Sequence, residues 1–197
     1  MNETPNQIKS MIEERFVKIA LDPAGERKFP VGPDSAKRLG YDAAEIDALP
    51  PQATESFAGV GNPLTLGDLR AGEVVLDLGC GAGMDSLLAA RRVEPMGRVI
   101  GVDMTGPMVE KARSNALAAG VGNAEFQRGE ADRLPWADGS VDVVISNGVF
   151  NLCPDKPRVL AEVFRVLRPG GRLQMADILL NEDVTPEQVA RKGEWSD

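Results

Sequence analysis

The sequence predicts an α/β protein built on a doubly wound parallel sheet. From Glu73 onward, short apolar segments rich in branched residues alternate with segments whose apolar residues recur at helical spacing. A glycine-rich stretch, Gly79-Cys80-Gly81-Ala82-Gly83, directly follows the first apolar segment. An acidic residue, Asp103, ends the second segment about 20 residues later. These three observations predict repeated strand–helix–strand units, with a ligand crevice at the carboxyl ends of the strands.

Residues 1–70 are predicted to form a helical extension in front of this sheet. Thr4-Pro5-Asn6-Gln7 has the form of a capping box with proline at the first helical position. The apolar residues that follow at helical spacing predict an amphipathic helix to about Ala20. Its apolar face covers either the domain surface or, as a lid, a bound ligand; the pattern leaves both open. Prolines and glycines predict a loop over Asp22–Pro33. Short helices are predicted around Asp34–Leu39 and Ala43–Ala48, ended by Pro50-Pro51.

The sheet is predicted to contain five strands. They are Val74–Leu78, Arg98–Val102, Ala124–Arg128, Val141–Ser146 and Arg172–Ala176. Helices are expected between them near Asp85–Val93, Pro107–Ala119 and Asp155–Leu167. The last helix is expected to bury Leu160, Val163, Phe164 and Leu167 and to stop at Pro169-Gly170-Gly171. Right-handed crossovers and a switch point beside the first strand give the strand order 3-2-1-4-5.

The glycine-rich turn favours one class of ligand over another. Glycines accept positive φ and let a ligand approach the main chain, while a helix N-terminus offers free N–H groups. A dinucleotide fingerprint has its third glycine one place later, where Met84 stands. Asp77, inside the strand before the turn, would repel a phosphate and suit a cationic ligand. The pattern therefore disfavours a nicotinamide oxidoreductase, although a tight turn with no ligand at all stays open.

Asp103 occupies the position at which nucleotide-binding βαβ units place a carboxylate for the ribose hydroxyls. Taken alone it is an ordinary residue at the end of a strand. In combination with the glycine-rich turn, the ribose-binding interpretation is favoured.

The composition of the chain limits which binding partners and which cellular location we expect. The chain has 197 residues and a net charge of −8, which argues against a nucleic-acid partner. No apolar run approaches the ~18 residues of a membrane span, and no leader precedes a cleavage site. Two cysteines do not make a disulfide scaffold, so we expect a reducing cytoplasm. The absence of histidine removes the commonest general base and metal ligand, and no metal site is predicted.

The motif series resembles that of class I S-adenosylmethionine-dependent methyltransferases. The resemblance covers roughly Ala71–Leu180, and its motifs are Leu76-Asp77-Leu78-Gly79-Cys80-Gly81-Ala82-Gly83, Val102-Asp103-Met104, Leu134-Pro135 and Leu167-Arg168-Pro169-Gly170-Gly171. Further stretches resemble the arsenite methyltransferases in particular: Gly40-Tyr41-Asp42, Gly61-Asn62-Pro63, Gly101-Val102-Asp103-Met104-Thr105, Val143-Val144-Ile145-Ser146-Asn147 and Asn151-Leu152-Cys153-Pro154-Asp155-Lys156.

The resemblance implies a Rossmann-like domain at 71–180 that binds S-adenosyl-L-methionine and yields S-adenosyl-L-homocysteine. It also implies two further strands, a terminal hairpin, which this chain lacks. Residues 181–197 form a polar tail without a run that could make a buried strand. The chain is thus expected to be either naturally short or a fragment.

The resemblance also assigns the cofactor-binding residues. Gly79, Gly81 and Gly83 would support the methionine part on their backbone, with Cys80 serving as a small residue in the turn. Asp77 would hold the ammonium group, directly or through water, or else brace the turn.

Asp103 would bind the ribose diol. Met104 would pack on the adenine, or be plain core. Glu130 and the Ala131 main chain would meet the adenine edge, unless Glu130 is only an exposed loop acid. Asn147 is expected to face the crevice, with Phe150 and Asn151 as pocket wall.

The cysteines bear on the substrate. Arsenite methyltransferases bind arsenic(III) through several thiolates, because a soft metalloid prefers soft ligands. This chain has Val60 and Gly148 at two of those positions, and the third would fall after its end. Cys80 and Cys153 remain, and Cys153 could reach the site, but one thiol is a poor chelate.

The function predicted is therefore an arsenite methyltransferase-like enzyme that methylates an unidentified small molecule. In-line transfer needs positioning more than a base, so no catalytic residue is assigned. The alternatives are a non-catalytic S-adenosylmethionine-binding protein and a truncated arsenite methyltransferase. The sequence does not indicate the oligomeric state.

Overall fold

The computed structural model describes residues 4–179. Within them a five-stranded parallel sheet has the order β3-β2-β1-β4-β5, as the sequence predicted. The strands are β1 Val74–Leu78, β2 Arg98–Asp103, β3 Ala124–Arg128, β4 Val141–Asn147 and β5 Leu167–Ala176. Leu78 lies opposite Val102 on one side and Ser146 on the other. The three central strands therefore bring their carboxyl ends to one edge of the sheet.

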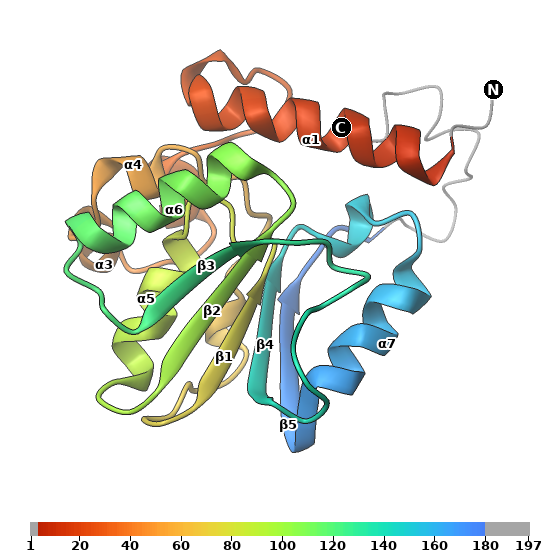
Figure 1. Ribbon diagram of the computed structural model, residues 1–197. Coiled ribbons are helices and arrows are strands. Elements are labelled where there is room, and N and C mark those ends of the chain that lie inside the picture. The colour runs from red at the N-terminus through yellow and green to blue at the C-terminus, as the bar shows by residue number, and fades with distance from the viewer. Residues whose placement is uncertain (1–3, 180–197) are drawn as a thin grey trace.

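Helices cover both faces of the sheet (Figure 1). They are α5 Met84–Val93, α6 Gly106–Ala118 and α7 Lys156–Val166. Residues of α5 and α6 share a core with Val75 and Val143, whereas α7 shares a second core with Leu76 and Val144. Successive side chains of a strand point to opposite faces, so a continuous apolar strand feeds both cores.

The N-terminal segment packs on the same molecule. Its elements are α1 Pro5–Leu21, η1 Pro23–Gly25, α2 Pro33–Arg38, α3 Ala43–Asp47, α4 Pro51–Thr54 and η2 Pro63–Thr65. Thr4 and Gln7 form the predicted capping box. Ala36, Ile46 and Ala53 join the core on the α5 and α6 side. Pro50-Pro51 was expected only to end a helix, but Pro51 also begins α4, because proline suits the first helical turn.

Helix α1 crosses the edge of the sheet at which the strands end (Figure 1). Ile19 and Ala20 form a small buried cluster with Ala82 of the glycine-rich turn and Met108 of α6. The helix is thereby held directly above the turn between β1 and α5.

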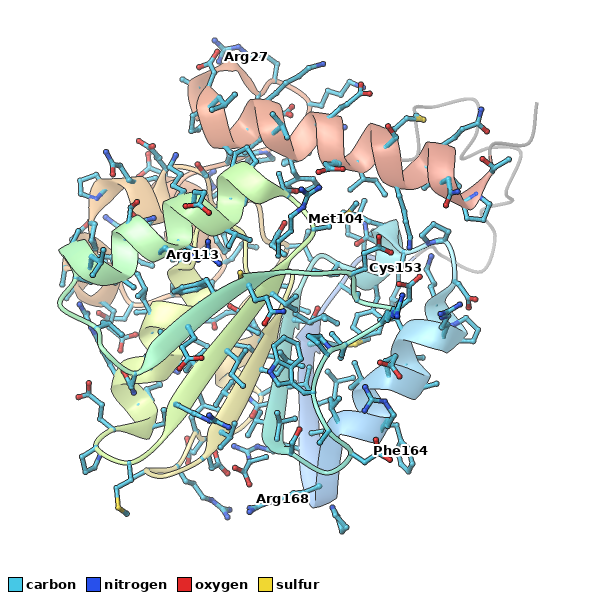
Figure 2. All side chains as sticks on the ribbon, viewed as in Figure 1. Arg27, Met104, Arg113, Cys153, Phe164 and Arg168 are labelled. Atoms are coloured by element: carbon cyan, nitrogen blue, oxygen red, sulfur yellow. The ribbon has the colours of Figure 1, made fainter. Side chains whose placement is uncertain are left out.

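Two predictions about the last helix and strand were wrong. Leu160 and Phe164 are 45% and 81% exposed, and Phe164 points outward from α7 in Figure 2. Val163 is buried as predicted and Leu167 packs against the same core, but the other buried residues of α7 are Val159 and Val166. Both sets of residues have helical spacing, and only contact with the sheet selects between them.

Strand β5 begins at Leu167 rather than Arg172. Val141 pairs with Leu167 and Val143 pairs with Arg172, so the register shifts between these two pairs and the Pro-Gly-Gly segment is included in β5. A short helix, η3 Phe150–Leu152, was not predicted. The predicted polar tail and the question of a terminal hairpin lie outside the described residues. Across residues 4–179, none of the helices is long and apolar enough to span a membrane.

Candidate functional site

The turn from β1 into α5 has a backbone that favours glycine at three positions. Gly79, Gly81 and Gly83 have φ of 72°, 51° and 91°, all in the left-handed region. The N–H groups of Gly79 and Cys80 donate to the Val102 carbonyl at 2.8 and 3.0 Å. The turn is therefore fixed against the end of β2.

The three glycines have different surroundings. A Cβ on Gly79 would collide with the Val149 side chain, and one on Gly83 would lie 3.2 Å from Ala112 and Phe126. A Cβ on Gly81 would meet nothing within 4 Å. Gly79 and Gly81 line a cavity at the carboxyl ends of the strands, whereas Gly83 packs between α6 and β3 outside it. Gly81 is thus the position at which a ligand can approach the main chain.

Asp103 connects the turn to the end of β2. Its carboxylate accepts from Gly81 N–H at 2.9 Å and from Thr105 N–H at 2.8 Å. Burial raises the pKa of Asp103, and these two backbone bonds oppose that shift. A carboxylate oxygen can accept a second hydrogen bond. Asp103 lines the cavity and can therefore hold a ligand diol while it shapes the turn.

Asp77 and Asp85 are two buried carboxyl groups beside the turn. Asp77 accepts from Ser86 Oγ at 2.5 Å, and Asp85 accepts from Tyr41 Oη at 2.5 Å. They are 3% and 7% exposed, so both are largely removed from water. Burial, together with the Asp85 charge, raises the pKa of Asp77 to about 8. Burial also raises the pKa of Asp85. Of the two, only Asp85 lines the cavity; Asp77 lies behind it.

Asn147, at the end of β4, joins Asp85 to two N-terminal segments. Its Nδ2 donates to Asp85 Oδ2 at 3.2 Å, to Tyr41 Oη at 3.1 Å and to the Gly61 carbonyl at 2.9 Å. Its Oδ1 accepts from Val60 N–H at 2.8 Å. Asn147 lines the cavity as expected from its position, and its amide also fixes the wall of that cavity.

The loop after β3 forms another side of the cavity. Glu130, Ala131 and Met104 all line it, and so do Lys9, Ile12 and Phe16 of α1. Lys9 Nζ lies 2.5 Å from the Glu130 carboxylate and 2.9 Å from that of Asp132. Figure 2 places Met104 and Cys153 at the edge of the sheet that α1 crosses. The first turns of α1 are therefore bound by charge to this loop.

Cys153 lies in the segment after β4. Its thiol donates to the Val149 carbonyl at 3.3 Å, and burial raises its pKa to about 11. It lines the cavity as an uncharged thiol. Phe150 and Asn151, which were expected in the pocket wall, do not line it. Phe150 is buried in the α7-side core, and the N–H groups of both residues donate to the Asp177 carboxylate at 2.7 and 3.1 Å.

Val60 and Gly148 face one another beside Asn147. A Cβ on Gly148 would lie 3.4 Å from Val60 Cγ1. These are two of the three positions at which the resemblance described above led us to expect a cysteine. The fold thus brings these two positions together, and the Val60 side chain lies beside Gly148.

The structure gathers most of the predicted residues around one cavity. Those that line it are Gly79, Cys80, Gly81, Asp103, Met104, Glu130, Ala131, Asn147 and Cys153. Asp85, Tyr41 and Lys9 were not proposed as site residues. Asp85 could have been noted as an acid two residues after Gly83, and Tyr41 as part of Gly40-Tyr41-Asp42. Lys9 has no signal beyond its place on an amphipathic helix. Within the described part of the chain, no group of three or more acidic or cysteine side chains is arranged to hold a metal ion.

Comparison with known families decides the assignment. A family model described as "Methyltransferase domain" matches residues 69–196. The chain belongs to the methyltransferase domain family. This confirms the S-adenosylmethionine-dependent methyltransferase family that the motifs predicted.

Similar proteins share this domain. An arsenite methyltransferase of Halobacterium salinarum is 43% identical over 189 residues, which is 89% of this chain and 48% of that protein. Nocamycin O-methyltransferase of Saccharothrix syringae is 37% identical over 68% of this chain and 45% of its own length. The crystal structure of an arsenic(III) S-adenosylmethionine methyltransferase from Chlamydomonas reinhardtii has a TM-score of 0.57 at 38% identity, covering 76% of this chain and 50% of that one. The chain is thus arsenite methyltransferase-like, and it spans about half the length of these relatives.

Proposed function

We propose that this chain binds S-adenosylmethionine in the cavity at the carboxyl ends of β1, β2 and β4 and transfers its methyl group to a small molecule. The observation that carries the proposal is the open face of Gly81, whose N–H donates to the Asp103 carboxylate and which lines the same cavity as Asp85. A cation with a ribose fits this set of groups better than a pyrophosphate, which the same acids would repel.

The residues present fit the cofactor. The Gly79–Gly81 backbone would support its methionine part, the Asp103 carboxylate its ribose diol, and Met104 with the Glu130-Ala131 loop its adenine. When bound, the cofactor supplies an electrophilic methyl group on a sulfonium. The protein's part is to hold donor and acceptor in line and to exclude water, which is worth roughly 7–11 kcal/mol in well-oriented systems.

Helix α1 is proposed to act as a lid over this site. Its Lys9, Ile12 and Phe16 line the cavity, and Lys9 pairs with Glu130 and Asp132 of the proposed adenine loop. Helix α1 would have to move away before an enclosed cofactor could dissociate. The ion pairs therefore contribute to cofactor residence time rather than to the chemistry.

The acceptor is proposed to be a small molecule other than a thiolate-bound arsenic(III). Gly148 and Val149 line the cavity where the resemblance led us to expect a cysteine, and Cys153, with its pKa raised to about 11, is not a thiolate at neutral pH. Relatives are named for different acceptors, arsenite and nocamycin among them. A cytoplasmic location fits the two free cysteines, Cys80 and Cys153.

Calorimetry and a transfer assay test the proposal. We expect S-adenosylmethionine and S-adenosylhomocysteine to bind the chain and NAD not to bind. Transfer of a labelled methyl group to a member of a small-molecule panel would support catalysis. Binding without transfer to any of them favours the alternative of a cofactor-binding protein, and absence of binding refutes both.

A further inference from the structure

The loop that follows β4 forms one wall of the cavity. Gly148, Val149, Leu152 and Cys153 all line it. None of the groups proposed above to hold the methionine, ribose or adenine parts of the cofactor comes from this loop. The wall is therefore available to face the methyl acceptor, and what holds the loop in place bears on how the acceptor is positioned.

The loop is attached to the rest of the molecule by one carboxylate. Phe150 and Asn151 do not line the cavity, and the Phe150 side chain is buried in the core on the α7 side. Phe150 N–H donates to Asp177 Oδ2 at 2.7 Å, and Asn151 N–H donates to Asp177 Oδ1 at 3.1 Å. Asp177 Oδ1 also accepts from Ile178 N–H at 2.8 Å. Asp177 thus joins the loop after β4 to the segment after β5.

The register of the sheet places Asp177 at this point. Asn147 of β4 lies opposite Ala176 of β5, and Gly148 N–H donates to the Ala176 carbonyl at 2.8 Å. Asp177 is the next residue along, where the loop leaves β4 and backbone pairing between the two strands ends. The side chain supplies acceptors for N–H groups that the ladder no longer pairs. Hydrogen bonds to an ionised carboxylate are also roughly twice as strong as neutral ones.

The anchored residues determine the position of the residues that line the cavity. The Val149 carbonyl accepts from the Cys153 thiol at 3.3 Å and from Leu152 N–H at 3.0 Å. Cys153 N–H donates to the Phe150 carbonyl at 3.1 Å. A shift of Phe150 away from Asp177 would therefore move Cys153 and Leu152 as well.

The glycine-rich turn has a separate support. Gly79 and Cys80 donate to the Val102 carbonyl, and Gly81 donates to Asp103. These bonds all run to β2 and do not involve the loop after β4. A change at Asp177 should therefore affect the wall of the cavity more than the turn proposed to bind the cofactor.

We propose that Asp177 is a positioning residue for the methyl acceptor. By holding the amides of Phe150 and Asn151, it fixes the wall formed by Val149, Leu152 and Cys153 and so sets how the acceptor meets the transferred methyl group. This inference rests on the proposed function. Asp177 does not itself line the cavity and acts through the loop. In-line transfer depends steeply on the alignment of donor and acceptor, so a displaced wall is costly.

The Asp177→Asn variant tests the inference. Asparagine keeps the size of the side chain but offers one acceptor oxygen and no charge, so one of the two loop amides loses its partner. We expect iodoacetamide to alkylate Cys153 roughly tenfold faster than in the parent, as the loss of a hydrogen bond to a charged group allows. Peptide mass spectrometry distinguishes this adduct from one on Cys80. Calorimetry should show an affinity for S-adenosylhomocysteine within about twofold of the parent's, because the turn is held by β2.

Kinetics with a panel acceptor that the parent methylates separates positioning from a general structural role. In Asp177→Asn we expect the KM for that acceptor to rise about fivefold or more, while the KM for S-adenosylmethionine stays within about twofold. A general loss of structure would change both constants together.

Asp142→Asn is a matched control. Asp142 Oδ2 accepts from Val74 N–H at 2.7 Å, the same length as the bond from Phe150 to Asp177, but at the amino end of β4 and outside the cavity. This variant should leave the alkylation rate, the cofactor affinity and both KM values as in the parent. Thermal unfolding of each variant shows that the comparison is made between folded proteins.

The inference is overturned if Cys153 in Asp177→Asn reacts at the parent's rate. It is overturned equally if cofactor affinity falls as far as the acceptor KM rises, since Asp177 would then support the whole cavity. Failure of S-adenosylhomocysteine to bind the parent refutes instead the proposed function. If the parent binds it and methylates no member of the panel, the catalytic part of the proposed function fails, and with it the role of Asp177 toward an acceptor; the alkylation rate then still decides whether Asp177 holds the wall.

Discussion

Substitution of Gly81 by valine tests whether the glycine-rich turn is a ligand cradle. Gly81 has φ of 51°, and a Cβ there meets nothing within 4 Å. The structure therefore allows the side chain, and the cost to stability is backbone strain alone, about 1–2 kcal/mol for a residue other than glycine in the left-handed region. For a chain of this size that lowers Tm by roughly 2–8 °C, so the variant should fold.

Binding should be affected far more than stability. The valine side chain would stand in the cavity, on the side where the cofactor is proposed to lie against the backbone. We expect at least a hundredfold loss of affinity for S-adenosylhomocysteine, which corresponds to about 2.7 kcal/mol. Titration calorimetry measures the affinity and thermal unfolding measures the strain.

Gly120 offers a matched control. It has φ of 66°, its Cβ would also meet nothing within 4 Å, and it follows α6 outside the cavity. Gly120→Val should lower Tm by a similar amount and leave the affinity unchanged. If Gly81→Val binds the cofactor as tightly as Gly120→Val does, the reasoning about the turn is wrong.

Four further predictions follow from individual side chains. Asp103→Ala should weaken S-adenosylhomocysteine binding by about 1–3 kcal/mol, because ribose hydroxyls lose their acceptor; unchanged affinity in calorimetry would place the ribose elsewhere. Burial raises the pKa of Asp77 to about 8, above its ordinary value, so the protonated form is favoured in the folded state. The free energy of unfolding should therefore fall as pH rises from about 4 to about 8, and Asp77→Asn should flatten that fall in denaturant titrations; a rise over that range that the variant removes would contradict this. In an assay with arsenite and glutathione, the chain should form methylarsenicals far more slowly than a full arsenite methyltransferase. The Val60→Cys, Gly148→Cys double variant tests whether added thiols raise the rate. Gly148 has φ of 71°, so a cysteine there is strained. Robust methylarsenical formation by the parent, abolished by Cys153→Ser, would show that fewer thiols suffice. Lys9→Met should speed cofactor dissociation about two- to fivefold, the weight of a partly exposed ion pair, whereas Lys37→Met, which breaks the distant pair with Asp47, should not; equal rates in both variants would speak against α1 as a lid.

The sequence by itself determined the features that depend on local backbone pattern. The first strand, the glycine-rich turn and the acid at the end of β2 were predicted correctly, and the strand order followed from the handedness of the crossovers. The strands and the turn depend on a few residues each, because branched apolar runs form buried strands and glycines adopt the positive φ that other residues resist. The position of Asp103 against Gly81 then follows from parallel pairing of β1 and β2.

Only the tertiary structure decided which distant side chains meet. Tyr41 and Asn147 are 106 positions apart, yet both contact Asp85. The sequence pattern around Tyr41 or Asn147 does not predict that contact. The same holds for Val60 beside Gly148. It holds too for α7, where Val163 is buried as predicted but the sheet covers Val159 and Val166 rather than Leu160 and Phe164. Spacing along the chain fixes which residues share a face, but which face is covered depends on the shape of a partner surface that exists only once the chain has folded.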